Sequence, residues 1–139
     1  MATRPFVLLE MQDAVQAILK PDPILLQMVT GIHDADAVPI NAPFPYITYG
    51  PHVDQSYPTY SGHINSDALF LLDVWSDKSR AELYGILAEI RRLLDNVTLA
   101  MPDYGSSMFQ YEWSTVLYNQ DTKFWNAPMR YHAYSFELV

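Results

Sequence analysis

The chain has 139 residues, half of them hydrophobic, and its 16 acidic and 8 basic side chains give a net charge of −8 at pH 7. This predicts one domain, residues 1–139, and the absence of cysteine excludes disulfides and thiol catalysis. The basic residues are scattered, which argues against a nucleic-acid-binding surface. The sequence contains no apolar run long enough to predict a membrane span.

Two helices are predicted at the N-terminal end. Apolar residues recur with a helical period from about Pro5 to Leu19, and Thr3 is the expected cap of this helix. Two prolines then interrupt the pattern. Asp22 is placed to cap a second, short helix, which Gly31 ends.

Four main strands are predicted from short apolar or alternating runs, at about residues 46–49, 67–76, 108–118 and 129–138. A brief strand is also expected within residues 32–38. Residues 102–107 predict a turn, and residues 119–123 a hairpin connection. The segment 51–66 is rich in Tyr, Ser, Pro and Gly without periodicity, and predicts a loop or a mobile hairpin arm.

Alternation assigns faces to three of these strands. The strand at 67–76 has an apolar face formed by Ala68, Phe70, Leu72 and Val74, and an opposite face that carries Asp67, Leu69, Leu71, Asp73 and Trp75. This second face is neither core nor ordinary surface, so we expect a second layer or another subunit to cover it. The strand at 108–118 places Phe109, Tyr111, Trp113, Thr115 and Leu117 on one side, and the last strand does the same for Tyr134, Phe136 and Leu138.

The third predicted helix has the clearest pattern. Ser79 and Glu82 form a capping box, and an apolar stripe follows until about Asp95. The elements together predict an α+β fold, with an antiparallel or mixed sheet of about four main strands backed by helices, in the order α-α-β-β-α-β-β.

Catalytic and metal-binding patterns are weak. His52, Asp54 and His63 could supply three metal ligands, but their spacing is unspecific, and solvated loop histidines are the simpler interpretation. The chain contains no nucleotide-binding glycine motif and no G-x-S-x-G nucleophile motif. We therefore expect neither an enzyme nor a cofactor.

Several segments together resemble the phage tail-completion family, also called the tail-terminator or tail-to-head-joining family. They occur in the family's order and span nearly the whole chain, up to the two final strands. They are Leu19-Lys20-Pro21-Asp22-Pro23-Ile24-Leu25, Gly31-Ile32-His33-Asp34, Val38-Pro39, Ala42-Pro43-Phe44-Pro45-Tyr46-Ile47-Thr48-Tyr49-Gly50, and Leu72-Asp73-Val74-Trp75-Ser76 before the amphipathic helix. Residues 51–66 and 100–107 depart from the family pattern.

The resemblance implies a structural virion protein, assembled in the host cytoplasm and located at the head–tail interface. Its partners would be its own copies in a ring of six, the tail tube protein and the head–tail connector protein. The ring would stop tube polymerisation, and DNA would pass through its acidic lumen without specific binding. A head-completion component of related fold and a small-ligand or metal-binding domain are the alternatives.

Five residues are candidates for the subunit or tube interface. The half-apolar strand face and the tyrosine-rich arm are the two candidate surfaces, since Tyr and Trp are enriched in protein interfaces. The candidates are Tyr57, Tyr60, Leu69, Leu71 and Trp75.

Overall fold

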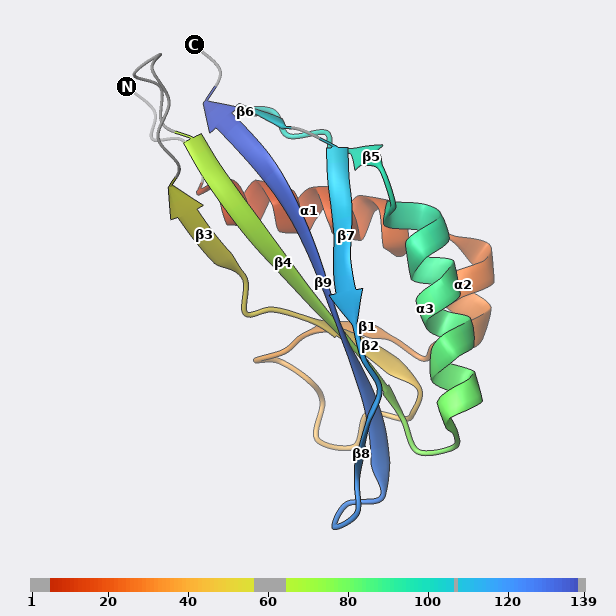
Figure 1. Cartoon of the computed structure of the whole chain (residues 1–139). Helices are drawn as coiled ribbons and strands as arrows, with labels where there is room; N and C mark the ends of the chain where they lie inside the picture. The colour runs from red at the N-terminus through yellow and green to blue at the C-terminus, as the bar shows by residue number, and fades with distance from the viewer. Residues whose placement is uncertain (1–5, 57–64, 107, 138–139) are drawn as a thin grey trace.

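The computed structural model describes residues 6–56, 65–106 and 108–137, which form three helices and nine strands (Figure 1). The helices are α1 (Val7–Leu19), α2 (Pro23–Met28) and α3 (Arg80–Leu94). The strands are β1 (Ile32–Asp34), β2 (Tyr46–Tyr49), β3 (Val53–Ser56), β4 (Asn65–Ser76), β5 (Val97–Thr98), β6 (Tyr104–Ser106), β7 (Met108–Ser114), β8 (Leu117–Asn119) and β9 (Phe124–Glu137). Within these ranges, no helix is both long enough and apolar enough to cross a membrane.

The sheet is built around two long strands. β4 and β9 pair antiparallel along the whole length of β4, from Asn65 opposite Phe136 to Ser76 opposite Trp125. The main path through the sheet is β1-β2-β4-β9-β7-β5, with β3 paired to β4, and β6 and β8 paired to β9. Only the β1–β2 pair is parallel among the described strand pairs, so the sheet is mixed, and Figure 1 shows how strongly its long strands twist.

The core lies between one face of this sheet and the helices. The predicted apolar face of β4 is buried there, and α3 contributes the stripe that its helical period predicts. The buried ring of Phe109 on β7 stacks on Tyr131 of β9, with ring centres 4.7 Å apart. One face of β4 packs entirely against the apolar core. Its apolar residues therefore alternate regularly along the strand, and the sequence alone predicts this face.

Side-chain caps fix two of the helices. The Ser79 hydroxyl accepts a hydrogen bond from the backbone N–H of Glu82, at 3.1 Å, and starts α3 as predicted. Asp22 accepts from the backbone N–H of Leu25, at 2.9 Å, and also binds Arg92 of α3, at 2.8 Å. Asp22 therefore both caps α2 and ties it to α3. Thr3, the expected cap of the first helix, lies outside the described residues.

The predicted set of four main strands is incomplete. β9 begins at Phe124, ahead of the expected Met129, because its first residues pair with β8 in a hairpin. Part of the expected turn at 102–107 is β6, which pairs with β9. The segment 51–66 begins with β3, which pairs with β4, and residues 57–64 lie outside the described chain.

The strand expected at 108–118 is two strands. β7 ends at Ser114 and β8 begins at Leu117. The register with β9 also shifts between Tyr111 and Trp113, which is the signature of a β-bulge. The shared face predicted for Phe109, Tyr111 and Trp113 is therefore wrong. The bulge places Trp113 beside Arg130, on the face of the sheet away from the helices.

Candidate interaction surface

The face of the sheet away from the helices is the candidate interaction surface, and we call it the open face. Leu69, Leu71 and Trp75 of β4 lie on it and are half-buried. Tyr134 and Phe136 of β9 share this face and are more exposed. The structure thus brings three of the predicted interface residues together, whereas Tyr57 and Tyr60 lie outside the described residues.

Trp75 is held in one orientation on the open face. Its indole N–H donates a hydrogen bond to the Thr48 hydroxyl, at 3.1 Å, and its ring stacks on Tyr46 with a centroid distance of 6.2 Å. Trp75 and Tyr46 are direct cross-strand partners of β4 and β2. A fixed aromatic ring loses little conformational freedom on binding, so this pair is well suited to a protein contact.

The aromatic surface continues from β2 to β9. Phe44 packs against Tyr46, with ring centres 5.2 Å apart, and against Phe124, at 4.6 Å. We call Trp75, Tyr46, Phe44 and Phe124 the aromatic row. Thr30 helps to position it, because the Thr30 backbone N–H donates to the carbonyl oxygen of Pro45, at 2.8 Å. The segment from Pro39 to Pro45, which contains three prolines and which we call the proline-rich segment, therefore delivers an aromatic side chain to the open face.

Two charged side chains on the open face, those of Arg130 and Asp73, have partners within the subunit. Arg130 pairs with Glu112, at 2.8 Å, and its guanidinium lies 5.3 Å from the ring centre of Trp113. Asp73 accepts a hydrogen bond from the Asn126 side chain, at 3.0 Å. Burial nevertheless raises the pKa of Asp73, while the Asn126 hydrogen bond opposes that shift. A partner that covered this face would bury these groups already paired, which lowers the desolvation cost of the contact.

The candidate metal ligands occupy a different place. The Nδ1 atom of His52 accepts a hydrogen bond from the backbone N–H of Leu71, at 3.1 Å, and its ring stacks on Phe70. Burial lowers the pKa of His52 to about 4, with an opposing contribution from Asp34. His63 lies outside the described residues. Within the described ranges, no group of three or more His, Cys, Asp or Glu side chains could hold a metal ion.

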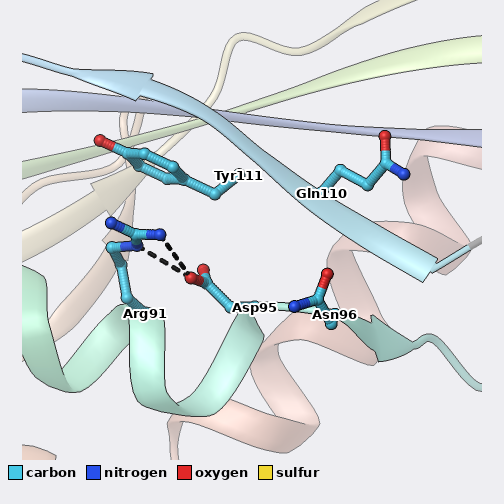
Figure 2. Close-up of a pocket in the computed structure, with 5 residues that line it drawn as sticks. All are labelled: Arg91, Asp95, Asn96, Gln110 and Tyr111. Atoms are coloured by element: carbon cyan, nitrogen blue, oxygen red, sulfur yellow. Dashed lines mark hydrogen bonds and ion pairs between the residues drawn. The ribbon is translucent and has the colours of Figure 1, made fainter.

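A polar pocket of about 310 Å³ lies between the end of α3 and β7, and Figure 2 shows five of its residues. Arg91 binds the Asp95 carboxylate through two nitrogens, at 2.9 and 2.8 Å, and its guanidinium lies 3.8 Å from the ring centre of Tyr111. The Tyr131 hydroxyl donates to the other Asp95 oxygen, at 2.8 Å. Burial and this hydrogen bond to Asp95 raise the pKa of Tyr131.

These contacts join the C-terminal end of α3 to the sheet. The charges of Arg91 and Asp95 compensate each other, so we interpret the pocket residues as a structural contact that holds α3 against the sheet. Nothing in the local sequence around Arg91 indicates that β7 returns to that point.

The β8–β9 hairpin is a second exposed apolar feature. Leu117 is 50% exposed and Tyr118 is 45% exposed. Tyr118 packs on Trp125, with ring centres 4.5 Å apart, and Arg80 lies over the same indole, at 5.2 Å. Figure 1 shows this hairpin extending away from the layer of helices, at the lower end of the view.

Comparison with known proteins identifies a family and solved structures of similar fold. Residues 13–135 match the family model described as "Tail completion protein gp17". A chain from the "Virion of native gene transfer agent (GTA) particle" superposes with a TM-score of 0.78 and 18% identity, over 91% of this chain and 94% of the other. The "Structure of bacteriophage SPP1 gp17 protein" matches with a TM-score of 0.61 and 17% identity, over 100% and 97% of the two chains. No curated protein sequence matches the chain.

Proposed function

Because the chain belongs to the tail completion protein gp17 family, we propose that it is a tail terminator that assembles into a ring of six at the end of the tail tube. The family and the two virion folds agree on the coarser role: this is a structural protein of the phage virion that takes part in tail completion. The family resemblance that the sequence predicted is confirmed. The ring, its tube-capping action and its individual partners belong to the proposal.

In the proposed role, the ring binds the tail tube protein on one side and the head–tail connector protein on the other, after assembly in the host cytoplasm. It stops further polymerisation of the tube. The net charge of −8 suits a lumen through which DNA slides, because acidic side chains repel the phosphate backbone. The proposal assigns no catalysis and no cofactor to the protein.

The observation that carries the proposal is the open face. Trp75, Leu69 and Leu71 lie on a sheet face opposite the core, with the aromatic row beside them. An aromatic, partly desolvated surface of this kind is typical of the buried centre of a protein interface. We propose that it is a subunit or tube contact, with Tyr57 and Tyr60 of the arm as further contact residues.

Trp75→Glu tests this placement. The variant should fold, because the Trp75 side chain lies on the open face rather than in the core, and its assembly should weaken by at least roughly 30-fold, the effect of a hot-spot residue of about 2 kcal/mol. Circular dichroism reports folding, and light-scattering mass with and without tail tubes reports assembly.

Two further variants make the result decisive. Leu71→Glu places a charge on the same face without touching the Trp75–Thr48 hydrogen bond and should also weaken assembly. Trp75→Phe retains a ring against Tyr46 and should assemble. If both glutamate variants assemble normally, or if both fail to fold, the open face is not the contact that we propose.

The alternative roles make different predictions. A head-completion component would bind the connector and leave tube ends free. A metal-binding domain using His52, Asp54 and His63 would gain thermal stability from added Zn²⁺ or Ni²⁺, because a ligand of the native state stabilises it by mass action. The proposed terminator should bind tube ends and show no such gain.

A further inference from the structure

A pocket of about 420 Å³ lies between α1 and the segment that joins β5 to β6. Its apolar lining consists of Ala14, Ala17, Ala100 and Pro102. Three carboxylates, those of Glu10, Asp13 and Asp103, also line it. The pocket is therefore an apolar trough with a negatively charged border.

Glu10 is the unusual member of this border. It is only 7% exposed, and its Oε1 atom accepts a hydrogen bond from the backbone N–H of Asp103, at 3.0 Å. Its Oε2 atom is buried and has no hydrogen-bond partner among the described residues. A buried carboxylate oxygen without a donor is costly, so a donor that reaches this atom from the pocket would be favoured.

The chemistry of the pocket selects a basic side chain. The three carboxylates are not arranged in a group that could hold a metal ion within the described ranges. A Lys side chain fits better, because its aliphatic stem can pack on the alanines while its ammonium group donates to a carboxylate of the border.

Lys123 is the best-placed lysine of the chain to enter such a pocket on another molecule. Arg91, Arg92 and Arg130 are already in ion pairs. Lys20, Lys78 and Lys123 make no ion pair among the described residues, and of these three only Lys123 stands at the turn of the β8–β9 hairpin. Figure 1 shows this hairpin turn and the region of α1, β5 and β6 at opposite ends of the molecule, so one chain cannot join them.

Internal hydrogen bonds fix the conformation of the hairpin turn that carries Lys123. The Asn119 side-chain oxygen accepts hydrogen bonds from the backbone N–H groups of Asp121 and Thr122, at 2.9 and 3.2 Å. The backbone N–H of Lys123 donates to the Asn119 carbonyl, at 2.7 Å. These bonds satisfy the turn internally, so the Lys123 side chain is left to interact with a partner.

We propose that the pocket bordered by Glu10, Asp13 and Asp103 receives Lys123 from the β8–β9 hairpin of a neighbouring copy. Two different surfaces at opposite ends of one subunit make a heterologous contact, which produces a closed ring when the rotation closes. The inference rests on the proposed ring and adds the contact that would link successive subunits. The exposed side chains of Leu117 and Tyr118 would be covered in the same contact.

Charge reversal gives the first test. Lys123→Glu should weaken self-association about tenfold or more, as expected when one partner of a desolvated charge pair is replaced. Asp13→Lys should act in the same direction, and Asp13→Lys combined with Lys123→Glu should restore association. Lys78→Glu changes the charge equally at an exposed site before α3 and should have no effect. Asp121→Asn, on the same turn, should leave association unchanged or strengthen it.

Cross-linking gives an independent test, because the chain has no cysteine of its own. Ala17→Cys places a thiol on the exposed part of the pocket lining, and Thr122→Cys places one beside Lys123. Treated with a short bis-maleimide, the double variant should give a ladder of covalent oligomers. Each single variant, and Thr122→Cys combined with Ala81→Cys on α3, should give no ladder.

The outcomes separate this inference from the proposed function. A ring that forms normally without the ladder, and that tolerates Lys123→Glu, overturns the Lys123 contact and leaves the ring in place. A ladder from a protein that ignores tail tubes supports the contact and contradicts tube capping. If neither a ring nor a ladder forms at high protein concentration or on tubes, both ideas are wrong.

Discussion

At the residue scale, His52 shows how one side chain can replace a main-chain acceptor. β2 and β3 both pair with β4, and between them the chain steps away from its partner strand. The Gly50 N–H donates to the Leu71 carbonyl, at 3.0 Å, and the Leu71 N–H donates to His52 Nδ1. Gly50 has a φ of +97°, which favours glycine at this step. The His52 side chain therefore completes the hydrogen bonding of β4 between β2 and β3 and is not simply solvated.

This role predicts a pH dependence of stability. The pKa of His52 is lowered from 6.5 to about 4 in the folded chain. Between these values the unfolded chain binds a proton that the folded chain does not, so stability must fall as the pH falls. The free energy of unfolding should decrease by up to about 3 kcal/mol from this group between pH 6.5 and 4.

Denaturant unfolding at several pH values measures this effect. His52→Asn is the matched control, because its side-chain oxygen can accept from Leu71 but does not titrate in this range. The difference in stability between the original protein and this variant should shrink as the pH falls from 6.5 to 4. A difference that is constant with pH would contradict the depressed pKa of His52.

At the element scale, the sequence predicts those helices and strands in which apolar residues recur in a regular pattern. The extents of α1, α3, β2 and β4 follow from their own patterns, since each presents one regular face to the core. β5, β6 and β8 have two or three residues each, which is too short for any period to appear. The bulge between Tyr111 and Trp113 was also unpredictable, because it depends on the register with β9 and not on the local sequence.

Some residues of the candidate surface can likewise be predicted from the local sequence, whereas others depend on how distant segments meet. The mixed character of the second face of β4 predicts Leu69, Leu71 and Trp75 as interface candidates, and the structure places all three on the open face. Phe44 could not be assigned to the open face from sequence, because its position depends on how the proline-rich segment folds back toward β9. The acidic pocket also remained hidden, since it joins α1 to a segment about 90 residues further along the chain.

The junction of α2 and α3 gives a prediction at this scale. Asp22→Ala removes the cap of α2 and its ion pair with Arg92, so the melting temperature should fall by roughly 3 °C or more. Asp22→Asn preserves the capping acceptor and should lose less. Calorimetry of both variants measures this, and equal losses would show that the ion pair, rather than the cap, dominates.

At the scale of the whole molecule, the described residues present three surfaces to partners: the open face, the acidic pocket and the β8–β9 hairpin. The open face carries the aromatic row and the predicted interface residues of β4. The pocket between α1 and the β5–β6 segment and the β8–β9 hairpin lie at opposite ends of the subunit (Figure 1). A subunit with distinct surfaces of this kind is suited to a ring that also contacts other virion components.

The most direct test of the terminator role is light-scattering mass after size exclusion, combined with electron microscopy of the protein mixed with purified tail tubes. Six subunits of 15.9 kDa give about 95 kDa for a ring. We expect either this mass in solution or a monomer that forms rings only at tube ends, and tubes treated in this way should stop growing. A monomer that leaves tube ends bare while the tubes continue to polymerise would contradict the account.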